Sequence, residues 1–456
     1  MAQEKTGRQT GIWNWIDRIQ GDKVIWMIVI LLILYSIVTI FSSTSQLASK
    51  DVSRIDIFME QMVVVGIGVG IIIFCYAFMR IGWIRWLSQL GFIVSAVLLV
   101  LLFFIGKEIN GAKRVIEIAG FQLNVYEVVK VAMVVYLSWA IHAYRTGSFW
   151  IANKLASKVG WLSFLSRAGW QRLIYIHFPI VFVTVCILAG GFSSAMFIGG
   201  ILILTVLIGG VPGKDIAKLI GVALLAVACS YGLFKATGGK EAGDKAQFSR
   251  WATVEERIAR FLRPGSVEEF QPGTKEWQEH LDEIRQPEGA KIAIKEGGLF
   301  GKGPGKSTQK YTVALIFSDF MFSFIIEEYG LLFGAIPLII LYVSLLARGS
   351  IIVRYCDNEF ARTAVAGLTL LISTQAMMHM FINVGLWPLT GQTLPMISHG
   401  NSSFLAFSVA FGILLSISKM AKKKVDQAVQ EAEPLIVPSD DDVKDGLDDL
   451  DAFESN

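Results

Sequence analysis

Ten apolar stretches of near-bilayer length constrain this chain more than any other feature of its sequence. They lie at about 24–42, 58–79, 86–105, 123–144, 174–190, 193–210, 216–235, 322–347, 361–385 and 400–419. A transmembrane helix needs about 20 apolar residues. Hydrophobic residues make up 54% of the chain and charged residues 17%, against about 45–50% and 25% in soluble domains. The sequence therefore predicts an all-α polytopic membrane protein with ten transmembrane helices. It excludes a cytosolic enzyme, a disordered scaffold and a secreted disulfide-bonded domain.

The distribution of basic residues predicts the orientation of these spans. With the N-terminus in the cytoplasm, the short inside loops and flanks hold eighteen Lys and Arg, and the short outside loops hold five. Cytoplasmic loops are enriched in Lys and Arg, so both termini are expected inside. The large loop at 236–321, between the seventh and eighth spans, is then extracytoplasmic.

Three regions follow from this topology. Residues 1–23 form a cytoplasmic N-terminal segment, and residues 24–424 form the membrane domain. Residues 425–456 carry eleven Asp and Glu against the single Lys444. Such an acidic segment is typical of a disordered, solvated tail.

The large outer loop is where function is expected to concentrate, because long loops on a rigid scaffold often carry sites. Within it, residues 254–263 and 276–285 have amphipathic, helix-compatible patterns. They are interpreted as short helices on the outer leaflet, with a solvated loop as the alternative.

A glycine- and lysine-rich segment, residues 297–310, closes this loop. Its glycines allow close backbone approach, and Lys302, Lys306, Lys310 and Gln309 could donate to phosphate oxygens. The spacing is not that of a Walker A loop. An anion site and a flexible re-entry loop are both compatible with this pattern.

Several charged residues lie at or near membrane depth, where charge is costly and usually functional or paired. Asp319 precedes the eighth span, and Glu327 and Glu328 follow two turns later. Helix capping and ion pairing are the structural alternatives for these carboxylates. Glu127 and Lys130, spaced i, i+3 on one helix face, are candidate substrate-binding residues, and an internal ion pair that holds the bundle together is the favoured structural alternative.

Two further polar segments face the same side of the membrane. Lys113 and Arg114, in the outside loop before the fourth span, are either headgroup anchors or ligands for a pyrophosphate. Residues 390–403 are polar and interrupted by Gly and Pro, and irregular backbone at membrane level must line a cavity or protein. Ser398, Ser402 and Ser403 are its candidate substrate-binding residues; His399 is interpreted as a structural histidine.

The cysteines and histidines show no disulfide framework and no metal-ligand spacing. No metal site is therefore predicted from the residues.

Together these segments resemble the SEDS family (shape, elongation, division and sporulation), the polytopic glycosyltransferases named for FtsW and RodA. The resemblance lies in six motifs in order along residues 24–419. They are Asn110-Gly111-Ala112-Lys113-Arg114, Glu127-x-x-Lys130, Gly297-Gly298-Leu299-Phe300-Gly301-Lys302-Gly303, Ser307-Thr308-Gln309-Lys310, Asp319-Phe320 with Glu327-Glu328-Tyr329-Gly330, and Leu394-Pro395-Met396-Ile397-Ser398 with Gly400-Asn401-Ser402-Ser403.

The resemblance implies polymerisation of lipid II into glycan strands at the outer face of the bacterial inner membrane. The family's essential aspartate falls on Asp319, which would act as general base in an inverting transfer. Cations among Lys113, Arg114, Lys302, Lys306 and Lys310 would steady the leaving pyrophosphate. A divalent ion, Mg²⁺ or Mn²⁺, is compatible with this chemistry, although no ligand cluster demands one.

The resemblance also implies partners. Family members act with a class B penicillin-binding protein transpeptidase, and other divisome membrane proteins are expected; no nucleic-acid partner is. Residues 42–45 favour the cell-division branch and a septal location over the elongation branch.

The chain departs from the family pattern at several positions, and two other function classes stay open. Val313–Phe317 replaces a usual Pro-Glu or Pro-Gln pair, Thr390 a common lysine, and His399 a tyrosine. Asp319 is consequently the site residue that the resemblance supports best. A lipid II flippase or a non-catalytic divisome scaffold could use the same fold.

Overall fold

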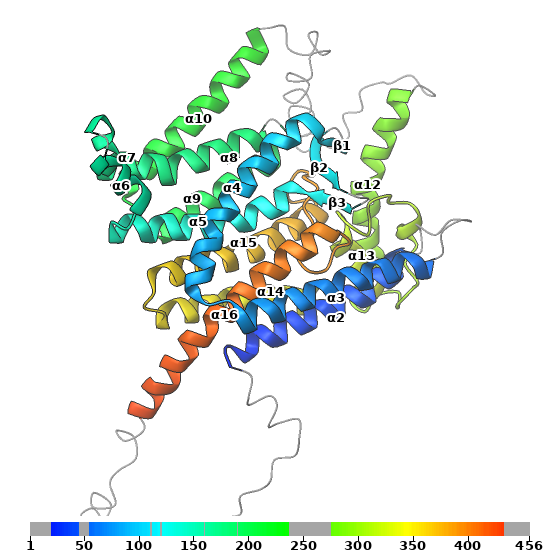
Figure 1. Cartoon of the computed structure of the whole chain (residues 1–456). Coiled ribbons are helices and arrows are strands. Elements are labelled where there is room, and N and C mark those ends of the chain that lie inside the picture. The colour runs from blue at the N-terminus through cyan, green and yellow to red at the C-terminus, as the bar shows by residue number, and fades with distance from the viewer. Residues whose placement is uncertain are drawn as a thin grey trace, which may run out of the picture.

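The computed structural model describes residues 20–44, 54–109, 112–118, 121–158, 160–188, 190–236 and 275–432 (Figure 1). Most of these residues are helical. The long helices are α2 (Lys23–Ser43), α3 (Arg54–Phe78), α4 (Ile81–Ile105), α5 (Val125–Thr146), α8 (Phe178–Leu188), α9 (Phe192–Ile208), α10 (Gly213–Ala236), α12 (Lys275–Gly297), α13 (Met321–Gly330), α14 (Ile336–Tyr355), α15 (Glu359–Asn383) and α16 (Asn401–Ala432).

Shorter elements join them. α6 (Trp150–Lys158), a 3₁₀ turn (Gly160–Ser166) and α7 (Ala168–Arg172) connect α5 to α8, with a π-helical turn at Leu173–His177. A second π-helical turn at Leu331–Ala335 joins α13 to α14, so that these two helices form one continuous apolar rod.

All ten apolar stretches coincide with helices, but not all reach the length and hydropathy of a span. Among the described residues, eight helical stretches are long and apolar enough to cross a membrane, and α9 is apolar but shorter. The polytopic helical architecture is thus confirmed, whereas the number ten stays a prediction.

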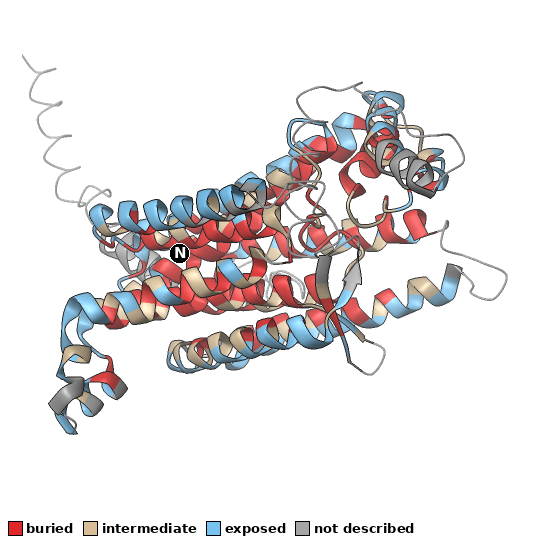
Figure 2. Ribbon diagram, turned by 90° about the horizontal axis from the view of Figure 1, so that it is seen from above, coloured by how far each residue is buried: buried red, intermediate tan, exposed pale blue. Residues whose placement is uncertain are grey.

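The centre of the bundle is formed by α5, α15 and α16. In their span windows 78%, 67% and 78% of the residues are buried, compared with 22% in α4. α3 packs on α16, α4 on α5, and α14 on α15. Figure 2 shows the buried residues along the middle helices and the exposed ones on the outside. The outer helices expose large apolar side chains such as Val63, Ile93 and Phe104, which suits contact with lipid.

Side-chain caps fix where several helices begin, because the first backbone N–H groups of a helix lack partners. Asp22 Oδ1 accepts from the N–H groups of Val24 and Ile25. Asn124 caps α5 and Asn358 caps α15 in the same way.

A small antiparallel sheet lies in the loop between α4 and α5, where the sequence predicted no strand. It consists of β1 (Lys107–Ile109), β2 (Ala112–Ile118) and β3 (Phe121–Asn124), in the order β1-β2-β3. Val115 on β2 pairs with Asn124 on β3. Figure 1 shows the sheet at the end of the bundle near α12 and α13, and α6 and α7 at the opposite end. We call these the sheet end and the α6 end.

The described part of the large loop contains one α-helix, α12, which packs on α13 and α15, and a 3₁₀ turn at Gln309–Tyr311. The helix predicted at 276–285 is confirmed as part of it. The other predicted helix, at 254–263, lies outside the described residues, as do residues 1–19 and 433–456. Residues 425–432 continue α16 as helix, contrary to the prediction that disorder starts at 425.

Candidate active site

The sheet end brings Asp319 and Arg114 together over Gly391. A Cβ built on Gly391 would lie 3.1 Å from Arg114 Nη1 and 3.2 Å from Asp319 Oδ2. Gly391 has a φ of +62°, a left-handed conformation that glycine adopts without strain. The absence of a side chain at Gly391 therefore leaves room for the two charged groups, which come from β2 and from the residue two before α13.

The backbone around Asp319 is held by two polar side chains of α15. Asn383 Nδ2 donates to the Asp319 carbonyl at 3.1 Å, and Asn383 Oδ1 accepts from the Ser323 N–H at 3.0 Å. His379 Nε2 accepts from the Phe322 N–H at 3.3 Å, so its Nδ1 carries the proton donated to the Gln392 carbonyl at 2.7 Å. Both α15 side chains are fully buried.

The segment before α16 supports the same turn from the other side. Ser398 Oγ donates to the Ser318 carbonyl at 2.7 Å and accepts from the Leu394 N–H at 2.9 Å, and the His399 N–H donates to the Phe317 carbonyl. Met396 has a φ of 63°, the one positive value among described non-glycine residues. Strained backbone of this kind concentrates at functional sites.

The ion pair predicted between Glu127 and Lys130 is present and buried. Lys130 Nζ donates to Glu127 Oε1 at 2.7 Å, to Gln375 Oε1 at 2.6 Å and to Gln392 Oε1 at 3.2 Å. Gln375 Nε2 donates in turn to the Thr393 carbonyl at 3.1 Å. All three protons of the ammonium group thus have partners, and one of the contacted residues, Gln392, directly follows Gly391.

Ser402 and Ser403 are buried at the start of α16 and bind protein groups. Ser402 Oγ accepts from the Asn124 N–H at 2.9 Å, at the junction of β3 and α5. Ser403 Oγ lies 2.8 Å from Thr393 Oγ1. Both serines connect the 390–403 segment to its neighbours.

The glycine-rich segment is fastened to α13 by its backbone. The N–H groups of Lys302 and Gly303 donate to the carbonyls of Glu327 and Glu328 at 2.8 and 2.9 Å. Cβ atoms at Gly301 and Gly330 would lie 2.3 and 2.4 Å from backbone oxygens across this contact. These two glycines of the motifs therefore permit close backbone packing.

The Glu327 carboxylate holds the following loop. It is fully buried, and its oxygens accept from Ser307 Oγ at 2.5 Å, the Thr308 N–H at 2.8 Å, Lys302 Nζ at 2.9 Å and the Gln309 N–H at 3.3 Å. Residues 302–309 thus form a turn around a buried charge.

The candidate phosphate-binding lysines differ in whether other protein groups already bind their ammonium groups. Lys302 is paired with Glu296 and Glu327, and Lys310 is buried and donates to the Gly305 carbonyl at 2.8 Å. Lys306 is exposed. Lys113 lies on β2 opposite Glu108, and its side chain lies outside the described residues.

The electrostatic environment raises the pKa of Asp319. Part of the residue is exposed, but protein atoms surround the carboxyl, and this burial raises its pKa above the usual value. The positive charge of Arg114 and the hydrogen bond from Ser318 offset only part of the increase. A carboxylate with a raised pKa is a stronger base than an ordinary aspartate.

The described residues offer no group of three or more His, Cys, Asp or Glu side chains that could hold a metal ion. Asp319 is the carboxylate beside Gly391, with the Arg114 guanidinium next to it. One carboxylate could take Mg²⁺ only together with oxygens of a substrate.

Three site residues were missed by the sequence analysis: Gln375, His379 and Asn383. They follow one another at intervals of four along α15 and therefore share one helix face. Polar residues at this spacing within an apolar span are a signal that could have identified them. Gly391 had no such signal.

Fold and site together define a polytopic helical membrane protein with a polar site at one end of the bundle. A model of the cell cycle protein family FtsW/RodA/SpoVE matches residues 22–423. The chain belongs to this family.

Relatives and solved structures agree with this assignment. The chain is 31% identical over 323 residues to a protein of Caulobacter vibrioides named Probable peptidoglycan glycosyltransferase FtsW, covering 71% of this chain and 70% of that one. It is 28% identical over 408 residues to the protein of the same name from Trichlorobacter lovleyi, covering 87% and 93%.

The fold is similar to a chain of a solved peptidoglycan synthase complex, with a TM-score of 0.60, 21% identity and coverage of 88% of this chain and 98% of that one. It is also similar to RodA of Thermus thermophilus, with a TM-score of 0.54, 19% identity and coverage of 88% and 98%.

Proposed function

We propose that this chain is a peptidoglycan glycosyltransferase of cell division that polymerises lipid II. The observation that carries the proposal is the approach of Asp319 and Arg114 to the same point over Gly391. Arg114 Nε and Thr390 Oγ1 beside this point are buried without a hydrogen-bond partner. Unpaired buried polar atoms are costly, and a polar substrate would supply the partners.

Asp319 is the general base of the reaction. Its carboxylate takes the proton from the 4-hydroxyl of the acceptor sugar as that oxygen attacks the anomeric carbon of the donor, with inversion. The bond from that carbon to the lipid pyrophosphate breaks, and the pyrophosphate leaves without needing a proton. Its charge is stabilised by Arg114, with Lys113 and Lys306 as further candidate contacts.

Orientation and partners complete the proposal. The excess of Lys and Arg at the α6 end supports cytoplasmic termini, with the sheet end outside. Ten spans, an even number, would place both termini on that side. Lipid-linked substrate would then reach Asp319 from the outer leaflet at the septum. We expect a class B penicillin-binding protein as partner, since a neighbour by fold belongs to a peptidoglycan synthase complex.

The test is polymerisation of labelled lipid II by purified protein, alone and with its cognate transpeptidase. Wild type should form glycan chains, and Asp319→Ala and Asp319→Asn should not, while a thermal-unfolding assay shows all three folded. Asp357→Asn, an exposed carboxylate at the α6 end, is the matched control and should stay active. Absence of product from wild type with the partner present would favour lipid transport or scaffolding. Product from both Asp319 variants would remove Asp319 from the mechanism.

A further inference from the structure

The connection between α5 and α8 at the α6 end carries an unusual set of side chains. Residues 145–174 contain five Lys and Arg and no Asp or Glu. Two of the cations join the connection to the bundle: Arg145 pairs with Glu359 at 2.8 Å, and Arg172 pairs with Asp215.

The other three cations are Lys154, Lys158 and Arg167. All three are exposed. Within the described part of the chain, none of them forms an ion pair with a carboxylate. This surface therefore offers positive charge to something outside the protein.

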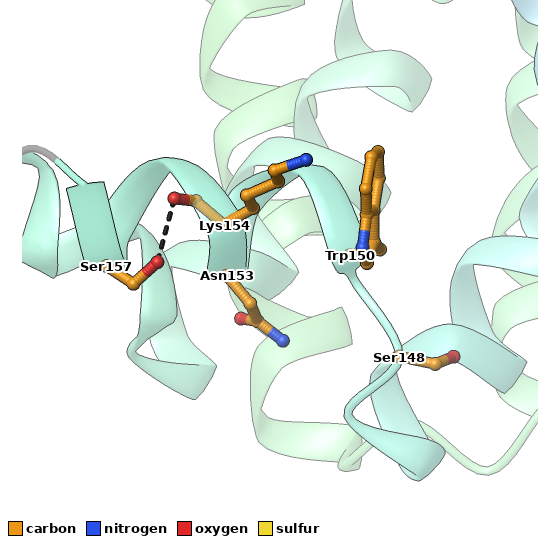
Figure 3. A pocket seen from close by; sticks show the side chains of 5 residues that line it. All are labelled: Ser148, Trp150, Asn153, Lys154 and Ser157. Atoms are coloured by element: carbon orange, nitrogen blue, oxygen red, sulfur yellow. Dashed lines mark hydrogen bonds between the residues drawn. The ribbon is translucent and has the colours of Figure 1, made fainter.

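An aromatic side chain and a hollow accompany the charge. Trp150 is 69% exposed, and Lys154 Nζ lies 4.4 Å from the centre of its ring. A hollow of about 500 Å³ is lined by Ser148, Trp150, Asn153, Lys154 and Ser157 (Figure 3). Asn153 Nδ2 donates to the Gly147 carbonyl at 3.0 Å, and Ser157 Oγ donates to the Lys154 carbonyl at 2.9 Å. These hydrogen bonds hold the two lining side chains in place.

We propose that this hollow binds the headgroup of an anionic phospholipid of the cytoplasmic leaflet. The proposal rests on the orientation proposed above and is independent of the catalytic step. Lys154 contacts the lipid phosphodiester, Lys158 adds positive charge one turn along α6, and Trp150 lies at headgroup depth beside the acyl chains. Amphipathic rings are enriched at this depth, and basic side chains near an anionic leaflet are attracted to it.

A lipid fits this surface better than a protein partner does. The general excess of Lys and Arg in cytoplasmic loops would account for the lysines alone. It does not account for an exposed indole beside a polar hollow, with an ammonium group 4.4 Å from the centre of its ring. Exposed indoles are enriched at the depth of the lipid headgroups.

Native mass spectrometry of the full-length protein with added lipid tests the proposal. Phosphatidylglycerol should stay bound to wild type under collisional activation that removes phosphatidylcholine. The double variant Lys154→Gln, Lys158→Gln should hold about tenfold less phosphatidylglycerol, and Trp150→Ala should also hold less. The matched control Lys214→Gln, Arg354→Gln removes two exposed cations elsewhere at the α6 end and should bind like wild type.

Three outcomes would overturn the proposal. They are equal retention of the two lipids by wild type, equal losses in the double variant and its control, and displacement of phosphatidylglycerol by the same concentration of inorganic phosphate. Each variant is first required to unfold within a few degrees of wild type, so that a loss of lipid reports on the hollow.

Discussion

Asp319 and Arg114 face the same point in space because Gly391 lacks a side chain there. The carboxylate comes from the turn before α13 and the guanidinium from a strand about two hundred positions earlier in the chain. A single backbone position, with its φ of +62°, thus sets how closely the base and its neighbouring cation approach.

Gly391→Ala should abolish polymerisation. The added Cβ would lie 3.1 Å from Arg114 Nη1 and 3.2 Å from Asp319 Oδ2, and a non-glycine residue in this conformation costs about 1–3 kcal/mol. The measurement is the rate of glycan formation from lipid II.

Gly147→Ala separates backbone strain from obstruction of the site. Gly147 has a similar φ of +65°, but a Cβ there would meet no atom within 4 Å. Gly147→Ala should lose about as much stability as Gly391→Ala and should keep its polymerisation activity. If both alanine variants polymerise equally well, Gly391 has no role in the site.

Arg114→Gln should move the acid limb of the pH–rate profile to higher pH. Asp319 acts as a base only when ionised, so activity falls as the pH drops through its pKa. Arg114 lowers that pKa, and removing the charge raises it further. Initial rates measured across the acid range check this shift.

Arg114→Lys keeps the charge and should leave the limb near its wild-type position. A uniform loss of rate without any shift in Arg114→Gln would contradict coupling to Asp319 and assign Arg114 to the substrate alone.

Asp319→Asn should unfold at a higher temperature than wild type at neutral pH. Because burial raises the folded-state pKa of Asp319, ionising this group costs stability at every pH above its unfolded pKa. Asparagine keeps the shape and can still accept from Ser318. The difference in unfolding temperature between Asp319→Asn and wild type should disappear as the pH falls below about 4. A variant less stable than wild type at neutral pH would contradict the raised pKa.

The sequence predicted the helices well and the site in part, for a physical reason. A span is encoded by local hydropathy, so the segment at 24–42 matches α2 (Lys23–Ser43) closely. The Glu127–Lys130 pair is also local, at one helix turn. By contrast, the contact between Asp319, Arg114 and Gly391 joins three distant segments, and no local pattern encodes such a contact.

The glycine motif shows a second limit of prediction from local sequence patterns. The same glycines suit a phosphate loop and a tight backbone contact, and only the partner segment distinguishes them. In the structure that partner is the end of α13, where Gly330 meets Gly301. The small sheet was missed because strands of three to seven residues carry little periodicity.

Glu327→Gln should destabilise the protein more than Glu328→Gln. Glu327 accepts from Ser307 Oγ, from the N–H and Oγ1 of Thr308, from the Gln309 N–H and from Lys302 Nζ, with which it also forms an ion pair. Glu328 Oε1 accepts from Ser42 Oγ at 2.6 Å and from the Ser307 N–H at 3.4 Å, and its Oε2 has no partner. Leaving the Lys302 ammonium without this charge costs about 1–3 kcal/mol.

Thermal unfolding of the two variants measures the difference, and their neighbouring positions make them matched controls. Equal melting temperatures would show that the loop does not depend on the Glu327 charge. Limited proteolysis between 302 and 310 should be faster in Glu327→Gln than in Glu328→Gln, since Glu328 contacts the turn through one long hydrogen bond, from the Ser307 N–H at 3.4 Å.

Removing one member of the Glu127–Lys130 pair should be worse than removing both. Lys130→Met leaves the Glu127 carboxylate buried without its cation, which costs about 3–5 kcal/mol. The double variant Glu127→Gln, Lys130→Met removes both charges and should recover much of that stability. Lys130 Nζ also donates to Gln392 Oε1 at 3.2 Å, and Gln392 directly follows Gly391. The rate of polymerisation should therefore recover less than the melting temperature does. A double variant as unstable as the sum of the two single variants would show that the two side chains act independently.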